Sequence, residues 1–570
     1  MTVTIFRGKL DAGNPRRGSV LCRFGIFVVI SCTAVAAEAG VWCYRPYEYE
    51  AWMLQRMRIE ADRGVLHFNY PGKFLQLSKE PVAVYCETPV EGMEAIPGEA
   101  GEPPHRRMRP MKTQEPKFAD GIYDLGHLDI GYVAVEADFR PTLFVGESLP
   151  EVSNSDWSGF EQLTLMVPDG PSRWRSDIPL ALRYIRFDGP VRSCSFRSQV
   201  DWREPVGDFT CGDGRKERMW RLGAETLRLC TRTFLIDGIK RDRLPWAGDL
   251  AVEIMAEAYT FGDPEPVKRT LAALGSGDMT QGNVNGIAAF SLWWVIGHDL
   301  LQRYFDETGY LRLHYPKIRA RMAEIATHED ERGFFAKDLS WDFMDWTDRK
   351  GGEFRSEITR QVIYFGALQA AVRLSKRVDD GASAAKWAAK AERLKAAILS
   401  AGMDRTRHAR MLAIYFDLVD GDMAKCYAAE IATGDLPPTV TPYMSSFEVM
   451  ALVKAGEVSA ALKKFESVWG EMVDFGVDAY WEGWDHADKG EEVYEYYGRP
   501  FAKSLCHAWA SGPAFLIPGT FLGIRPTADG WRTWEAKPLL PEFAPNAKVR
   551  VPAKAGTFAV TIQSGKVLVP

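Results

Sequence analysis

The sequence predicts a multidomain protein of helices and strands, in which a helical barrel lies between an N-terminal β-sandwich or jelly-roll region and a small C-terminal β-domain. Three observations support this order. Apolar residues recur at helical spacing between residues 212 and 520, whereas short apolar stretches broken by Gly, Pro and Asp precede and follow this part. The chain of 570 residues is also long enough for about two to four domains.

A targeting segment is predicted at the start of the chain. Basic residues come first, an apolar run follows at 24–30, and an A-x-A cleavage pattern ends at Ala36. The run is too short to span a membrane. We therefore expect residues 1–36 to be a signal segment and the protein to be exported: periplasmic, secreted or, through a loose processing box at Cys32, a lipoprotein. The alternative is a cytoplasmic protein that begins near Val41.

Residues 40–210 are expected to form the N-terminal β-region, because apolar stretches of strand length alternate with turn residues. Residues 91–117 are rich in Glu, Pro and Arg and are predicted to form an exposed loop. The expected strands include 132–135, 143–145, 163–167 and 182–187.

Residues 212–520 are expected to form the helical domain. A segment of this length accommodates about twelve helices with their loops, which suits a barrel of paired inner and outer helices. The self-similarity of a helical repeat array is absent from the sequence. The expected helices cover 217–234, 250–259, 288–304, 315–325, 358–378, 382–399, 412–418, 424–431, 446–455, 458–469 and 503–516. Residues 521–570 are expected to form the C-terminal β-domain, with strands at 548–551, 558–562 and 567–569.

Composition excludes several classes of function. Hydrophobic residues make up 46% and charged residues 26%, as in globular proteins. The net charge of −6 gives no basic excess for binding nucleic acid. The nine cysteines include no CxxC pair and no zinc spacing, so no metal is predicted. The aromatic content of 12% favours a carbohydrate partner, because aromatic faces stack on sugars, although most such rings fill cores.

The segment 237–249 has the densest set of charged residues in the chain. A solvated turn would also be charged, but apolar residues bracket this segment, which favours a functional site. It holds the carboxylates Asp237, Asp242 and Asp249, the cations Lys240, Arg241 and Arg243, and Trp246.

Two further segments supply a second carboxylate and a histidine. Glu482 lies between Trp481 and Trp484, which is typical either of a buried structural acid or of an acid in a sugar cleft. His507 is placed on the last predicted helix, where a lone histidine is more often a core residue than a catalyst. Two carboxyl groups with aromatic rings nearby favour glycoside hydrolysis. The Walker-type loop of phosphoryl transfer and the G-x-S-x-G of esterases are absent from the sequence.

Several motifs in one order resemble the bacterial α-L-rhamnosidases of glycoside hydrolase family 78. The resemblance runs from Trp42 to near the C-terminus. It rests on YEYEAW (47–52), VGES (145–148), LRYIRF (182–187), DGIKRDRLPWAGD (237–249), WW (293–294), FMDW (343–346), YWEGW (480–484), SLCHAW (504–509) and LGIRP (522–526).

The resemblance implies an (α/α)6 catalytic barrel with flanking β-sandwich domains and an inverting hydrolase that releases terminal α-L-rhamnose, without a cofactor or metal. It implies that Asp242 is the general acid, where the family more often has the longer Glu, and that Glu482 is the general base. The substrate-binding residues that we expect are Asp237, Arg241, Trp246, Asp249, Trp294, Trp346, Trp481, Trp484 and His507.

Alternative interpretations stay open at this point. Another (α/α)6-barrel glycosidase fits the same pattern, as does a polysaccharide lyase that uses Tyr480 or His486 as its base. A non-catalytic sugar-binding relative is favoured by the shorter acid at Asp242. The expected partner is a rhamnose-containing glycan or glycoside; the sequence leaves its linkage and the oligomeric state open.

Overall fold

The computed structural model describes residues 112–154, 166–176, 179–198, 200, 203–232, 234–240, 242–275, 279, 282–337, 339 and 341–568. The predicted signal segment and the motif at 47–52 lie outside these residues. Every helix in the described ranges is too short or too polar to serve as a membrane span.

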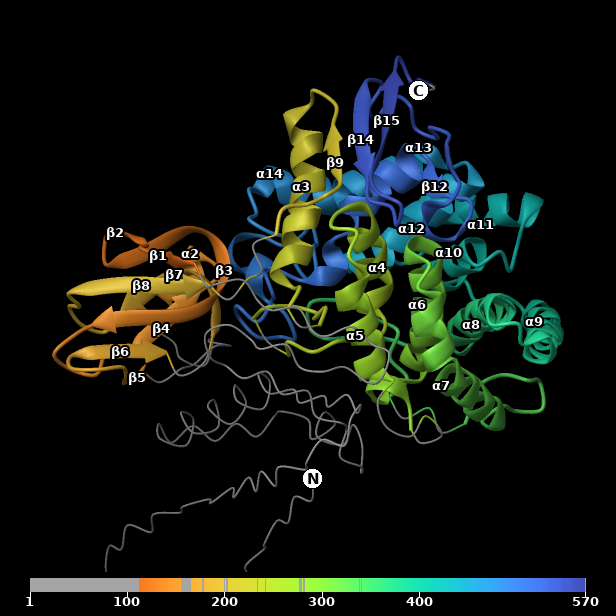
Figure 1. Cartoon of the computed structure of the whole chain (residues 1–570), viewed down its shortest axis with the longest axis horizontal. Helices are drawn as coiled ribbons and strands as arrows, with labels where there is room; N and C mark the ends of the chain where they lie inside the picture. The colour runs from red at the N-terminus through yellow and green to blue at the C-terminus, as the bar shows by residue number, and fades with distance from the viewer. Residues whose placement is uncertain are drawn as a thin grey trace, which may run out of the picture.

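The N-terminal β-domain is built around one long strand, β3, which pairs antiparallel with β2, β6, β7 and β8 (Figure 1, at the left). The short helix α2 (Leu149–Ser153) follows β4 and is capped by the Ser148 side chain. The predicted strands at 132–135, 143–145 and 182–187 are confirmed, whereas most of 163–167 lies outside the described residues. The strands are β1 (Thr113–Gln114), β2 (Lys117–Ala119), β3 (Ile122–Glu136), β4 (Leu143–Gly146), β5 (Met166–Pro168), β6 (Arg173–Ser176), β7 (Leu180–Phe187) and β8 (Ser193–Ser198).

The helical domain follows the predicted order of elements. Most expected helices are confirmed within a few residues, and the helix over 503–516 is the exception. The helices are α3 (Gly214–Leu229), α4 (Asp249–Tyr259), α5 (Pro264–Leu274), α6 (Ala288–Phe305), α7 (Thr308–Thr327), α8 (Glu357–Arg377), α9 (Gly381–Ala401), α10 (Arg407–Tyr415), α11 (Gly421–Thr433), α12 (Pro442–Ala455), α13 (Val458–Phe465), α14 (Glu471–Phe475) and α15 (Pro513–Phe515). Short helical turns are η2 (Val284–Gly286), η3 (Glu466–Gly470), η4 (Gly490–Tyr494), η5 (Ala508–Ala510), η6 (Leu516–Phe521) and η7 (Asp529–Trp531), and one hairpin pairs β10 (Asp345–Trp346) with β11 (Glu353–Phe354).

The inner helices close into a ring. Contacts run from α4 to α6, α8, α10 and α12, and then through η6 and α15 back to α4. Outer helices cover this ring: α5 packs on α6, α7 and α9 on α8, α11 on α10, and α13 on α12. These contacts define a barrel of paired helices.

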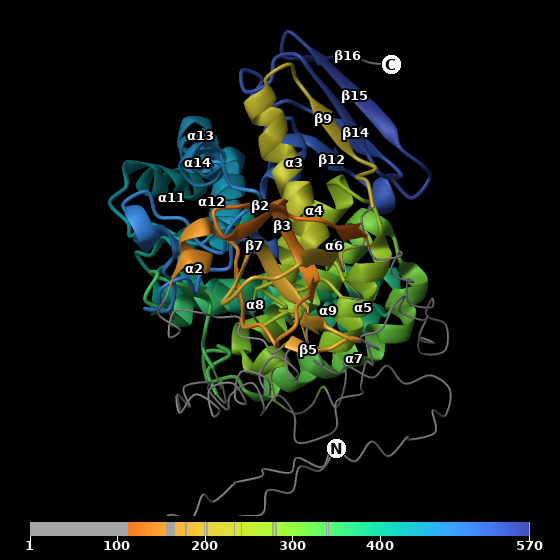
Figure 2. The same ribbon diagram turned by 90° about the vertical axis from the view of Figure 1, so that its left-hand side faces the viewer.

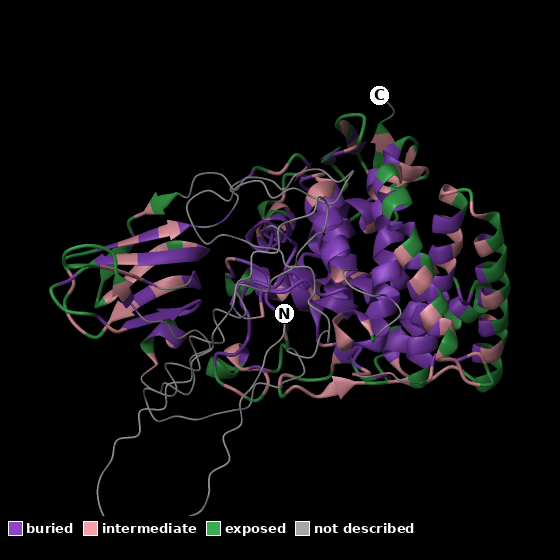
Figure 3. Cartoon of the chain, turned by 60° about the horizontal axis from the view of Figure 1, so that its bottom comes forward, coloured by how far each residue is buried: buried purple, intermediate pink, exposed green. Residues whose placement is uncertain are grey.

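Burial separates the two rings. Every residue of α4 is buried, whereas α9 buries only a stripe that includes Ala384, Trp387, Ala391 and Leu394, at the spacing of one helix face. Figure 3 shows buried helices through the middle of the domain and exposed turns at its edge. The core therefore lies between the rings and along the barrel axis.

The prediction of a helix over 503–516 is wrong. His507 has extended backbone angles, φ −135° and ψ 122°, and helical turns begin only at Ala508. The chain is extended there because its backbone groups bond to 480–482 and to the loop after α3. Pro513, which suits only the first turn of a helix, begins α15.

The C-terminal sheet includes a strand that precedes the helical domain in the sequence. β14 (Ala547–Val551) pairs with β15 (Phe558–Gln563), which pairs with β16 (Lys566–Leu568), as predicted. The other edge of β14 pairs with β9 (Asp208–Thr210). The assignment of residues 208–210 to the N-terminal β-region is therefore wrong, because these residues complete the C-terminal sheet. A further antiparallel pair joins β12 (Ile524–Pro526) and β13 (Trp534–Ala536).

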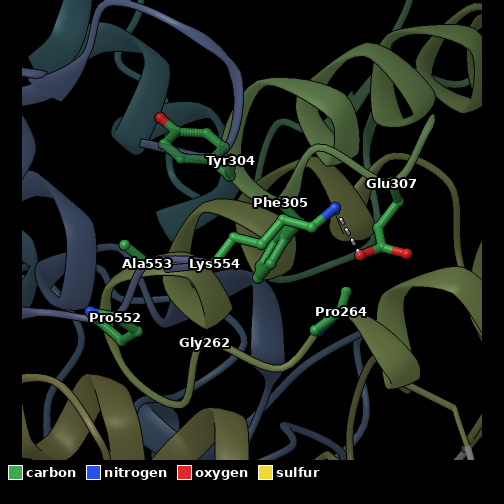
Figure 4. A pocket seen from close by; sticks show the side chains of 8 residues that line it. All are labelled: Gly262, Pro264, Tyr304, Phe305, Glu307, Pro552, Ala553 and Lys554. Carbon is green, nitrogen blue, oxygen red and sulfur yellow. Dashed lines mark ion pairs between the residues drawn. The ribbon is translucent and has the colours of Figure 1, made fainter. Parts of the chain in front are cut away.

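A small pocket of about 50 Å³ lies where the chain after β14 meets the helical domain (Figure 4). Tyr304, Glu307 and Lys554 line it, and Lys554 Nζ lies 3.9 Å from Glu307 Oε1. Gly262, also in its wall, follows the C-terminal end of α4, whereas Asp249 begins that helix. The pocket is therefore separate from the predicted acidic site.

The β-domain packs on the helical domain through an apolar core that residues of both domains form together. Leu128 and Ile130 of β3 and Ala181 of β7 share one buried cluster with residues on the other side, among them Cys230, Ile236, Ile239, Cys506 and Ala508. Figure 2 shows the β-domain toward the viewer against the helices. This core backs the segments that carry the predicted site.

Candidate active site

Three segments that are distant in sequence lie side by side at the N-terminal end of α4. His507 N–H donates to the carbonyl of Tyr480 at 3.0 Å, and Ala508 N–H donates to the carbonyl of Asp237 at 2.6 Å. Gly238 bridges to His507. A side chain at Gly238 would place its Cβ 2.8 Å from Ser504 Oγ and would have to displace that hydroxyl.

The loop that carries Asp242 is closed at its base and strained at its tip. Asp237 N–H donates to the carbonyl of Leu244, and Leu244 N–H donates to Asp237 Oδ1, both at 3.0 Å. Asp242 and Arg243 both have φ of 55°, in the left-handed region, which costs about 1–2 kcal/mol for each side-chain-bearing residue. This backbone leaves Asp242 half-buried while Arg243 points inward.

Asp237 is buried among other carboxyl groups. Burial raises its pKa well above the ordinary value, and the charges of Asp242 and Asp249 raise it further. These influences require the three carboxyl groups to be close together. The structure therefore gathers the three acids of the predicted motif in one place.

Asp249 begins α4 and faces His507. Nε2 of His507 lies 3.3 Å from Asp249 Oδ1, and both side chains are buried. Burial raises the pKa of Asp249, the imidazole of His507 opposes that rise, and the charge of Glu482 adds to it. One turn further along α4, Glu253 is also buried, and burial raises its pKa well above the ordinary value.

Glu482 is held from four sides. Its Oε1 accepts a hydrogen bond of 2.8 Å from the Tyr497 hydroxyl, and its Oε2 accepts one of 3.1 Å from Ser504 N–H. Its backbone N–H donates to the carbonyl of Ser504, and its carbonyl accepts from Trp509 Nε1. The side chain is 1% exposed. A carboxylate fixed in this way is pre-organised for one orientation.

The predicted aromatic residues fall into two groups. Trp346 packs edge-on against Tyr497 at 5.1 Å between ring centroids, which places it beside Glu482. Trp246 lies in the acidic motif and packs on Phe290 at the start of α6. Both rings therefore lie beside residues of the predicted site.

The described side-chain contacts of the other three tryptophans lie away from the motif acids and the Glu482 carboxylate, and Trp484 Nε1 donates to Glu471 at 2.8 Å. Trp294 is fully buried, and its Nε1 donates to the carbonyl of Leu271 on α5, which makes it a core residue. Trp481 and Trp484 pack on each other and on Phe475 of α14. Their rings therefore stabilise the segment that carries Glu482, and their predicted contact with a sugar has no support in these contacts.

The bases considered for a lyase are poorly placed. Tyr480 is fully buried and its hydroxyl donates to the carbonyl of Met219 on α3. His486 is exposed and lies 3.9 Å from Asp485. Arg241 lies outside the described residues. Among the described residues no group of three or more His, Cys, Asp or Glu side chains is arranged to hold a metal ion.

Sequence patterns do not reveal two residues of this site. Tyr497 lies in an irregular segment with no periodic signal, and only the folded chain brings it to Glu482. Tyr443, at the start of α12, stacks on Trp509 with centroids 5.6 Å apart and planes 4° from parallel. The charge of Asp249 contributes to raising the pKa of Tyr443, so this ring also borders the site.

Several solved rhamnosidases are similar to this chain in fold. A GH78 family rhamnosidase of Bacillus sp. GL1 has a TM-score of 0.64 at 20% identity, covering 80% of this chain and 52% of that one. A rhamnosidase from Klebsiella oxytoca with rhamnose bound has a TM-score of 0.61 at 21% identity, covering 71% of this chain and 88% of that one. A Streptomyces avermitilis α-L-rhamnosidase complexed with L-rhamnose has a TM-score of 0.62 at 16% identity, covering 79% of this chain and 48% of that one.

The chain therefore corresponds to about half the length of the Bacillus and Streptomyces proteins. A comparison with curated protein sequences found no match.

A ring of inner helices with outer partners, and with acidic residues at one end, is the architecture of the six-hairpin glycosidases. Residues 204–518, more than half of the chain, match the family described as the bacterial alpha-L-rhamnosidase 6 hairpin glycosidase domain. The chain belongs to this family.

Proposed function

We propose that the protein is an inverting glycoside hydrolase that releases terminal α-L-rhamnose from rhamnosides, oligosaccharides or polysaccharides. Asp242 is the general acid and Glu482 is the general base in this proposal. The observation that carries it is that His507 and its neighbours join the motif to the segment of Glu482: His507 Nε2 lies 3.3 Å from Asp249, Ala508 N–H donates to the carbonyl of Asp237, and His507 N–H donates to the carbonyl of Tyr480.

The mechanism follows from how the two acids are held. Like charges at close range favour retention of a proton, so the group formed by Asp237, Asp242 and Asp249 keeps one for the leaving oxygen. Asp242 delivers it, because its side chain reaches solvent at the tip of the loop. Glu482 takes a proton from water on the other face of the sugar, and an inverting pair of this kind is separated by about 6.5–9.5 Å.

The remaining residues of the site bind the sugar. Rhamnose is bound in the Klebsiella and Streptomyces relatives, and this chain offers the chemistry for such a ligand. Asp249 and His507 supply buried polar atoms for hydroxyl groups, and the Nδ1 of His507 has no hydrogen-bond partner among the described residues. Trp246 and Trp346 supply apolar faces for the ring and its methyl group.

The test is hydrolysis of p-nitrophenyl α-L-rhamnoside by the wild-type protein and by Asp242→Asn and Glu482→Gln. We expect each variant to lose about 10²–10⁴-fold in kcat, the usual contribution of a general acid or base. NMR of the first product should show the anomer of inverted configuration.

The matched control is Glu257→Gln, which removes a fully buried carboxyl at the other end of α4. We expect this variant to keep its activity. Full activity in both site variants would overturn the assignment of the acid and the base. Sugar binding without turnover would favour the non-catalytic relative, and an unsaturated product that absorbs in the ultraviolet would favour a lyase.

A further inference from the structure

A buried lysine joins the loop of Asp242 to the N-terminal β-domain. Lys240 Nζ lies 3.1 Å from Glu151 and 3.3 Å from Glu147, which belong to α2 and the turn before it. The exposed fraction of these three side chains is 1% or less. We call these residues the Lys240 cluster. A buried ammonium between two carboxylates is costly to desolvate, so the fold keeps it only with complete and close partners.

The same ammonium also binds the segment that leads to Ser504. Lys240 Nζ donates to the carbonyl of Phe501 at 2.8 Å and to that of Lys503 at 3.0 Å. Ser504, the next residue, donates its N–H to the Glu482 carboxylate. One charged group therefore contacts the loop of the proposed acid and the support of the proposed base.

The β-domain reinforces both connections. Glu147 Oε2 accepts a 2.7 Å hydrogen bond from Leu505 N–H, next to Ser504. Arg243, beside Asp242, donates to the carbonyl of Pro179, which lies directly before β7. Ile239 and Cys506 meet β3 and β7 in the apolar core between the domains. Polar and apolar contacts thus hold both segments against the same domain.

We propose that Lys240 is a positioning residue that fixes Asp242 relative to Glu482 by anchoring both segments to the N-terminal β-domain. This inference rests on the proposed function for its kinetic consequences. In an inverting hydrolase the separation of the two carboxyl groups sets the place of the attacking water, and an error of about 1 Å in such a geometry can cost about 100-fold in rate. Lys240 itself touches neither the substrate nor the water.

The experiment uses Lys240→Met in the full-length protein, with two rhamnosides that differ in leaving group. Phenyl rhamnoside needs protonation of its leaving oxygen, whereas 2,4-dinitrophenyl rhamnoside needs little. Misplacement of Asp242 should therefore lower kcat about 100-fold for the phenyl substrate and less than about tenfold for the dinitrophenyl substrate, because general-acid assistance matters less there. A change in stability alone would affect both substrates equally.

Hydrogen exchange provides a readout that does not depend on activity. Amides in 237–244 and 501–505 should exchange at least about tenfold faster in Lys240→Met if the anchor holds these segments. If Lys240→Met fails to fold, the same measurements are made on Lys240→Met/Glu147→Gln/Glu151→Gln, which removes the three charges together.

Arg203→Met is the matched control. Arg203 is a buried cation that bridges two carboxylates, Glu257 in the last turn of α4 and Asp263 just after that helix. We expect the Arg203→Met protein to be less stable than the wild type. Any loss in its kcat should be the same for the two rhamnosides. Equal losses on both substrates with unchanged exchange at 237–244 and 501–505, or unchanged activity on both substrates, would overturn the proposal. A wild-type protein without activity on any rhamnoside would overturn the proposed function, and the exchange data would still test the anchor.

Discussion

The hydroxyl of Tyr497 donates a 2.8 Å hydrogen bond to Oε1 of Glu482. Tyr497 follows Glu482, the proposed base, across an irregular segment, and its ring packs on that of Trp346. A phenol that donates to a carboxylate stabilises the ionised form of that carboxylate. Tyr497 therefore favours the form of Glu482 that can accept a proton from water.

Tyr497→Phe should reduce kcat/KM and move the acidic limb of its pH profile to higher pH. A hydrogen bond to a charged group contributes about 1.5–3 kcal/mol, so we expect a loss of at least about tenfold. The control is Tyr494→Phe, whose ring packs on Trp481 instead. An unchanged acidic limb in Tyr497→Phe would contradict this role.

Trp346→Ala should raise KM for a rhamnoside. The ring is half-buried at β10 and packs against Tyr497. An aromatic contact of about 0.5–1.5 kcal/mol corresponds to a rise of up to about tenfold in KM. Initial-rate kinetics measure this effect, and a normal KM would remove Trp346 from the sugar site.

Trp294→Ala should instead lower stability and leave the activity of the folded enzyme intact. Trp294 is fully buried between α6 and α5. Truncation of a buried aromatic side chain costs about 3–5 kcal/mol. Urea unfolding gives the stability, and specific activity at low temperature gives the function. A large loss of activity in folded protein would show that Trp294 contributes to the site after all.

Because its imidazole is buried, His298 should lower the free energy of unfolding as the pH falls. Burial lowers its pKa to about 3, although the carbonyl of Trp294, 2.9 Å from Nδ1, favours the protonated form. Because the unfolded state binds the proton more strongly, stability is lost as pH falls from about 6.5 toward 3. Between pH 7.5 and pH 5 this group alone costs about 2 kcal/mol.

His298→Gln should remove that part of the pH dependence. From pH 7.5 to pH 5 the wild type should lose about 2 kcal/mol more unfolding free energy than the variant does. His486→Gln, at an exposed histidine, is the control and should track the wild type. Parallel stability curves for His298→Gln and wild type would contradict the expected titration.

Much of the fold is predictable from local patterns. Helices such as α6 and α8 carry long apolar periodicities, and each lies within two residues of its expected range. Helix α5 is not among the expected helices, since it opens with Pro264 and Pro266 and buries Lys268 and Arg269. Val267 and Leu271 do follow helical spacing, but the prolines of the first turn and the charged residues at buried positions obscure that pattern.

The errors at the site have one physical cause. The extended conformation at 503–507 depends on hydrogen bonds to Tyr480, Glu482 and Asp237, which are distant in sequence. Such tertiary contacts outweigh local helical propensity. The acids of the motif could be recognised from sequence, because their chemistry lies in one segment. The roles of Tyr497 and Lys240 depend on long-range contacts, and single-sequence patterns carry no record of those.

The pairing of β9 with β14 has a consequence for biosynthesis. At about 5–20 residues per second, the ribosome needs roughly 20–70 s to travel from β9 to β14. During that time the edge of β9 that β14 will cover has no partner, while the helices between them are already being made. A C-terminally truncated protein would leave that edge exposed permanently. Shortened versions of this protein should therefore keep β14, β15 and β16, or remove β9 together with them.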